Sequence, residues 1–101
     1  MLYAYRYNPT AVEKITYAKN TDYYLSYSSY LYFILSGDGV HEISATRDGW
    51  IPSVVFIYND GSQELKGEGT ISVPSNVALI IVEVYGRFES GNQRAIFRIN
   101  S

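Results

Sequence analysis

Apolar and polar residues alternate along much of this chain, and a period of two is typical of β-strands. After a glycine-containing loop at Gly86–Asn92, the segment Arg94–Ile99 places Ala95, Phe97 and Ile99 on one side and arginines on the other. We expect a strand there, with the apolar set facing a core. β-branched and aromatic residues are frequent throughout, and turn residues recur at the short intervals of an all-β domain. The pattern predicts about eight strands.

The N-terminal third contains three candidate strands. Leu2–Tyr7 alternates up to a turn at Asn8. Thr10–Ala18 fits either a short helix capped by Asn8 or a strand, and a strand is favoured because the rest of the chain is β. Tyr23–Leu35 alternates for longer than an ordinary strand, so we expect a bend or bulge near Ser28.

The two faces of this third segment differ in polarity. The expected core-facing set is Leu25, Tyr27, Leu31, Phe33 and Leu35, and the expected outer set is Tyr24, Ser26, Ser28, Tyr30, Tyr32 and Ile34.

Glycine-containing turns divide the middle of the chain. Ser36–Gly39 should close a hairpin into a strand at Val40–Thr46, because glycine adopts the positive φ that tight turns need. Arg47–Ser53 is expected to be a loop. Val54–Tyr58 is apolar on both parities, which indicates a strand covered on both faces.

A second set of turns follows. Asn59–Ser62 contains Asp-Gly, which predicts a type I′ hairpin into a polar edge strand at Gln63–Lys66. Thr70–Val73 is a further strand, and Pro74–Asn76 is a turn before a second apolar strand at Val77–Tyr85. Two antiparallel sheets packed face to face, a single-domain β-sandwich, explain these strands best. A closed barrel is the less favoured alternative.

Tyrosine is concentrated at the start of the chain, where nine of the eleven occur within the first thirty-two residues. A phenol ring packs like a hydrophobe and also offers a hydroxyl. The tyrosines therefore form either the rim of a core or a surface for carbohydrate, collagen-like peptide or a neighbouring subunit. Trp50, in a loop, would be either a lid over the core or part of that surface. The candidate ligand-binding residues are Tyr3, Tyr5, Tyr24, Tyr30, Tyr32 and Trp50.

Composition limits the classes of function. The 101 residues carry a net charge of −2 without a run of Lys or Arg, which argues against nucleic-acid binding. The longest apolar stretch, Val77–Val82, is too short to span a bilayer. Cysteine is absent, so disulfides and thiol chemistry are excluded. No signal peptide is visible at the N-terminus. Localisation stays open, and would be extracellular for an excised accessory module.

No catalytic constellation is apparent. The single histidine, His41, is adjacent to Glu42, but neighbouring strand residues point to opposite faces. No nucleophile motif accompanies it. Turn aspartates at Asp38, Asp48 and Asp60 offer the oxygen ligands that calcium prefers, if they converge at one end of the sandwich. Turn geometry explains the same residues equally well. The sequence indicates no other cofactor and no enzyme.

The order of motifs over residues 30–99 resembles the bacterial and archaeal pre-peptidase C-terminal domain, related to collagenase collagen-binding domains. The segments that carry the resemblance are Tyr32–Val40, Ala45–Asp48, Val54–Ser62, Thr70–Pro74 and Val77–Gly86. The resemblance implies a non-catalytic, jelly-roll-like sandwich that serves secreted enzymes in secretion, stability or substrate attachment.

We therefore expect a non-catalytic binding or accessory module whose tyrosines contact a protein or carbohydrate polymer. The alternative is a structural, self-associating protein such as a virion, fibre or surface-layer component. A small hydrolase is the least favoured alternative.

Overall fold

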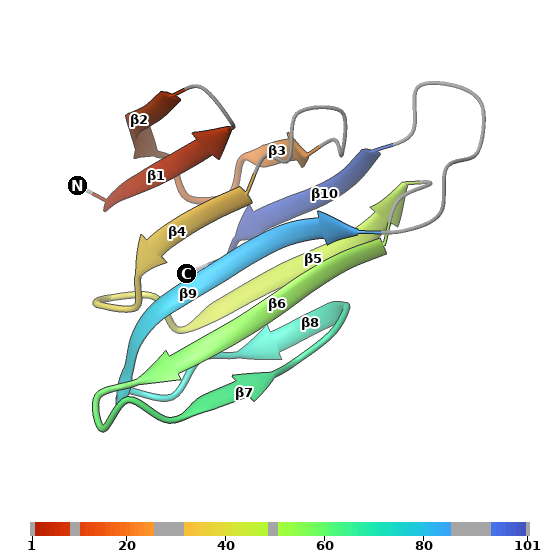
Figure 1. Ribbon diagram of the computed structural model, residues 1–101. Coiled ribbons are helices and arrows are strands. Elements are labelled where there is room, and N and C mark those ends of the chain that lie inside the picture. The colour runs from red at the N-terminus through yellow and green to blue at the C-terminus, as the bar shows by residue number, and fades with distance from the viewer. Residues whose placement is uncertain (1, 9–10, 26–31, 49–50, 86–93, 101) are drawn as a thin grey trace.

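The computed structural model describes residues 2–8, 11–25, 32–48, 51–85 and 94–100, which form ten strands (Figure 1). The strands are β1 (Leu2–Asn8), β2 (Ala11–Tyr17), β3 (Asp22–Leu25), β4 (Tyr32–Ser36), β5 (Glu42–Asp48), β6 (Ile51–Tyr58), β7 (Gln63–Leu65), β8 (Gly69–Ser72), β9 (Val77–Tyr85) and β10 (Arg94–Ile99). Within these ranges there is no helix of the length and apolarity needed to cross a bilayer.

The strands form two antiparallel sheets, one in the order β2-β1-β4-β9-β6-β7 and one in the order β3-β10-β5-β8. The pairs are nested: β6 pairs with β7, β5 with β8, β4 with β9, and β3 with β10. Successive pairs alternate between the sheets, which is the winding of an eight-stranded jelly roll. The β1–β2 hairpin extends the six-stranded sheet beside β4. The prediction of an antiparallel, jelly-roll-like sandwich is confirmed.

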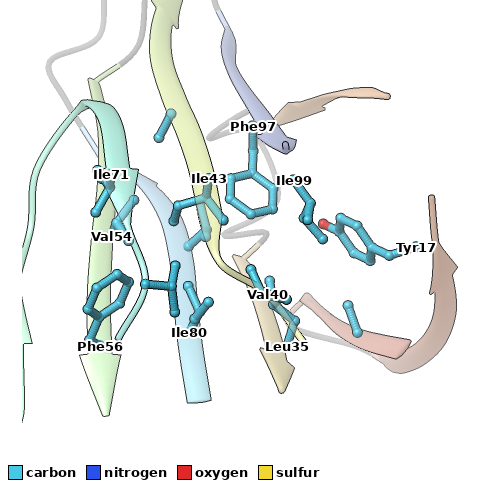
Figure 2. Packing of buried hydrophobic residues seen from close by; sticks show 14 of the residues in the cluster. Tyr17, Leu35, Val40, Ile43, Val54, Phe56, Ile71, Ile80, Phe97 and Ile99 are labelled. Atoms are coloured by element: carbon cyan, nitrogen blue, oxygen red, sulfur yellow. The ribbon is translucent and has the colours of Figure 1, made fainter. Parts of the chain in front are cut away.

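The core lies between the two sheets. Ala95, Phe97 and Ile99 of β10 are fully buried, as the alternation predicted. The Phe97 ring meets Tyr17 edge-on, with 6.1 Å between ring centroids, and Figure 2 shows Phe97 beside Ile43 and Tyr17 beside Ile99. Burial of each large apolar side chain contributes about 1.5–3 kcal/mol, so the apolar core between the two sheets is the main source of stability.

The Tyr23–Leu35 segment is not one strand with a bulge, and that prediction is wrong. β3 belongs to the four-stranded sheet and β4 to the six-stranded sheet, and Ser28 lies outside the described residues. Leu25 and Leu35 are nevertheless both buried, and Tyr24 is exposed. Both sheets face the same core, so the alternation continues across the change of sheet.

The expected hairpin at Ser36–Gly39 is also wrong, because β4 and β5 lie in different sheets. The Gly37 amide donates to the Ala78 carbonyl at 3.0 Å, which holds the corner against β9. A Cβ at Gly37 would lie 2.3 Å from the Val77 carbonyl oxygen. Glycine is therefore required here by close backbone approach.

The Asn59–Ser62 hairpin between β6 and β7 is confirmed, but its type I′ geometry is not. The Gly61 amide donates to the Tyr58 carbonyl at 2.9 Å, and Gly61 has a φ of +85°. Asp60 is not among the residues with positive φ, whereas type I′ needs positive φ at both central positions. The turn is type I followed by a glycine bulge, and the Asp60 carboxylate accepts hydrogen bonds from the Ser62 amide and hydroxyl at 2.9 and 2.6 Å.

The remaining expected elements agree with the structure more closely. The ambiguous segment Thr10–Ala18 is a strand, β2, and the polar strand β7 lies at a sheet edge. Pro74–Asn76 is a turn, closed by the Val77 amide donating to the Pro74 carbonyl at 3.2 Å. The loop expected at Arg47–Ser53 is shorter, because β5 ends at Asp48 and β6 begins at Ile51. The loop expected at Gly86–Asn92 lies outside the described residues.

Candidate interaction surface

An apolar row crosses the outer face of the six-stranded sheet. The strand register places Tyr5 beside Ile34, Ile34 beside Ile81, Ile81 beside Val55, and Val55 beside Leu65. Because directly paired residues on one face lie about 4.5–5.5 Å apart, these five side chains form a continuous band over five strands. Ile57 and Leu79 lie two residues from Val55 and Ile81 and share their face. On the adjacent strand β2, Lys14 pairs with Tyr5, and Val12 lies two residues from Lys14 on the same face.

These eight residues are defined here as the apolar outer face: Tyr5, Val12, Ile34, Val55, Ile57, Leu65, Leu79 and Ile81. Four of them are strongly exposed for apolar side chains, with Tyr5 at 42%, Val12 at 59%, Leu65 at 66% and Leu79 at 39%. The others are half-buried by their neighbours in the sheet. A contiguous apolar surface of this kind marks an interaction site more often than scattered exposed residues do.

Polar residues border the apolar outer face. Lys14 and Thr16 are exposed on β2, Gln63 is exposed on β7, and Glu83 is exposed on β9. Toward the start of β6 the face closes, because Ser53 is only 5% exposed. An apolar centre with a polar border is the usual anatomy of a protein–protein interface.

The outer face of the four-stranded sheet is different in chemistry. Its exposed or half-buried positions include Ser44, Thr46 and Thr70, and Arg98 pairs with Asp22 at 3.5 Å. Exposed charges and hydroxyls of this kind are well solvated, and ion pairs between them stabilise proteins little. The two outer faces of the sandwich therefore present contrasting surfaces.

The candidate tyrosines do not share one surface. Tyr5 belongs to the six-stranded sheet, whereas Tyr24, at 51% exposure, lies on the outer face of the four-stranded sheet. The backbones of Tyr3 and Tyr32 lie in β1 and β4, both in the six-stranded sheet. Tyr30 and Trp50 lie outside the described residues.

The aliphatic part of the surface was missed from the sequence. Strands β6 and β9 were expected to be covered on both faces, because both parities are apolar. In the structure Val54 and Val82 are buried, while Val55 and Ile81 on the other parity are half-buried and Leu79 is 39% exposed. In a two-layer sandwich each sheet has only one covered face, so apolar residues on both parities were the available signal of an exposed apolar surface.

A polar cluster fixes the edge strand β7. The Tyr58 hydroxyl donates to Glu64 Oε1 at 2.5 Å, and Lys66 Nζ lies 3.1 Å from the same oxygen. The hydrogen bond from Tyr58 and the charge of Lys66 lower the pKa of Glu64, and the bond to Glu64 raises the pKa of Tyr58. The Asp60 pKa is lowered by its hydrogen bonds from Ser62. These interactions stabilise the β6–β7 hairpin.

The three candidate calcium ligands lie on separate turns. Asp38 and Asp60 are exposed. Asp48 is the last residue of β5, six residues after Glu42 begins that strand, and so lies at the opposite end of β5 from Asp38. Among the described residues, no three of His, Cys, Asp and Glu are grouped closely enough to hold a metal ion. A calcium role stays a prediction. His41 is exposed, and its carbonyl accepts a hydrogen bond from the Val73 amide at 2.9 Å.

Comparison with protein-family models, with curated protein sequences and with solved structures found no match. The resemblance to the pre-peptidase C-terminal domain therefore stays a prediction.

Proposed function

We propose that the chain is a non-catalytic interaction module that docks a protein on its apolar outer face. The observation that carries the proposal is the band from Tyr5 through Ile34 and Ile81 to Leu65, which crosses five strands and remains partly open to solvent. Removal of such surface from water is favourable at about 25 cal/mol per Å², so a partner that covers the band gains affinity from it.

The chemistry of the band favours a protein over a carbohydrate. Seven of the eight residues of the apolar outer face are Val, Leu or Ile, and branched aliphatic side chains interdigitate with other protein side chains at well-packed interfaces. Carbohydrate recognition instead relies on flat aromatic rings combined with hydrogen-bonding groups. Of the described tyrosine side chains, Tyr5 contributes to this face, and Tyr24 is on the other sheet.

A selection experiment tests this proposal without a known partner. A cyclic-peptide library is panned against the purified protein, and the selected peptides are then tested against Leu79→Lys and Thr46→Lys. Both variants add one charge to a central strand, but on opposite outer faces. We expect most peptides to lose binding to Leu79→Lys and to retain binding to Thr46→Lys.

A glycan array tests the alternative, which is carbohydrate binding. Peptides that bind both variants equally would refute docking on the apolar outer face. Glycan binding that is abolished by Tyr24→Ser would instead assign the function to the four-stranded sheet and to a carbohydrate.

A further inference from the structure

We infer that the protein docked on the apolar outer face is a second copy of this chain, packed sheet to sheet in a symmetric dimer. The inference rests on the proposed function and identifies its partner. Two features of the face carry it: its area and the position of its centre.

The area is sufficient for a specific dimer. Six strands about 4.8 Å apart span roughly 29 Å when one strand width is included. The rows of outward-facing residues that contain Leu79, Ile81 and Glu83 extend about 20 Å along the strands. Without the buried position at Ser53 and the matching position beyond the end of β7, the face covers roughly 500 Å² per copy, and two copies bury roughly 1,000 Å², the smallest total expected of a specific interface. This is about a tenth of the accessible surface of 5914 Å², the share that a small protein commonly commits to one interface.

The centre of the face suits a twofold axis. The six-stranded sheet has its midpoint between β4 and β9, where Ile34 and Ile81 are paired. A twofold axis that runs parallel to the strands above this point, midway between two stacked sheets, brings Ile34 of one copy over Ile81 of the other, and Tyr5 over Val55. A symmetric dimer uses the same patch on both subunits, so a patch with apolar residues on both sides of its centre is self-complementary.

Sedimentation velocity over about 5–500 µM tests the inference, since interfaces of this size commonly reach micromolar affinity. We expect the wild type to convert from monomer to dimer within this range. Leu79→Lys should raise the dissociation constant at least about tenfold, because it buries an unpaired charge. Thr46→Lys, with the same added charge on the other sheet, should leave it unchanged. Circular dichroism confirms that each variant is folded.

Chemical cross-linking gives a second readout that needs no charged variant. The chain has no cysteine, so a single introduced thiol is unique. Ile81→Cys should cross-link efficiently to its symmetry mate through a bis-maleimide that matches the roughly 10 Å between packed sheets. Thr46→Cys should remain monomeric under the same conditions.

The outcomes separate this inference from the proposed function. A wild type that stays monomeric at every concentration overturns the symmetric dimer, as does a dimer that Leu79→Lys does not weaken or that Thr46→Cys cross-links equally well. If the selected peptides still bind the apolar outer face of a monomeric protein, the proposed function stands and its partner is a different protein.

Discussion

The corner at Gly37 provides a sharp test of how the chain passes from one sheet to the other. In Gly37→Ala the new Cβ would lie 2.3 Å from the Val77 carbonyl oxygen and 3.0 Å from the Val77 carbonyl carbon. Ordinary contacts of a Cβ begin at 3.4 Å, so the backbone of β9 must move by about 1 Å relative to β4. The atom in the way belongs to the backbone, and a side-chain rotation cannot relieve the overlap.

The expected cost follows from two effects. Overpacking of a well-packed site costs about 1–3 kcal/mol, and the movement weakens the hydrogen bond from the Gly37 amide to Ala78, worth about 1 kcal/mol. Replacing a glycine also lowers the conformational entropy of the unfolded chain, which offsets about 0.4–1 kcal/mol of this cost. We therefore expect the free energy of unfolding to fall by about 1.5–3 kcal/mol, a substantial part of the roughly 5–15 kcal/mol of a small domain.

Gly39→Ala is the matched control, two residues away in the same turn. Nothing lies within 4 Å of its added Cβ, and the only penalty is the φ of +75°, which costs a non-glycine residue about 1–2 kcal/mol before the unfolded-state gain is subtracted. Urea denaturation followed by circular dichroism measures both variants. If Gly37→Ala is no more destabilising than Gly39→Ala, the close approach of the corner to β9 is refuted.

Three further predictions concern the core and the polar contacts. Phe97→Ala should lower the free energy of unfolding by about 3–5 kcal/mol, measured by urea denaturation, and a cost below about 1 kcal/mol would contradict burial between the sheets. Arg98→Ala, which removes the exposed ion pair with Asp22, should change stability by less than about 0.5 kcal/mol in the same assay; a larger loss would show that the pair is structural. Tyr58→Phe should raise the Glu64 pKa toward its ordinary value of 4.5, measured by NMR titration of the carboxyl carbon. Because the folded-state pKa of Glu64 is lowered, the stabilisation is present above pH 4.5 and is lost as the pH falls through the folded-state pKa. An unchanged Glu64 pKa in Tyr58→Phe would disprove this coupling.

The side of each strand that faces the core could be predicted from the sequence, but the sheet to which the strand belongs could not. Leu25 and Leu35 share a parity and are both buried, yet they lie in different sheets. Hydrophobic alternation indicates which side of a strand faces a core. The inner faces of the two sheets of a sandwich contribute to one core, so the alternation is the same in either sheet. Ser36–Gly39 was misassigned as a hairpin for the same reason, because glycines serve both a tight turn and a change of sheet.

The candidate surface could be predicted only in part. Tyr5 was identified, since period two in a tyrosine-rich segment indicates one side of a strand. Leu79 was not, because an apolar strand suggests burial on both faces when the number of layers is unknown. The separation of Tyr24 from Tyr5 depends on strand order, which local spacing does not encode.

The most direct test of self-association through the apolar outer face is a dilution series of amide NMR spectra. The account predicts that signals of Leu79, Ile81 and Ile34 shift with protein concentration between about 10 and 500 µM, while those of Thr46 and Ser44 stay fixed, because micromolar self-association is expected for this area. Shifts confined to β5, or no shift at any concentration, would contradict it.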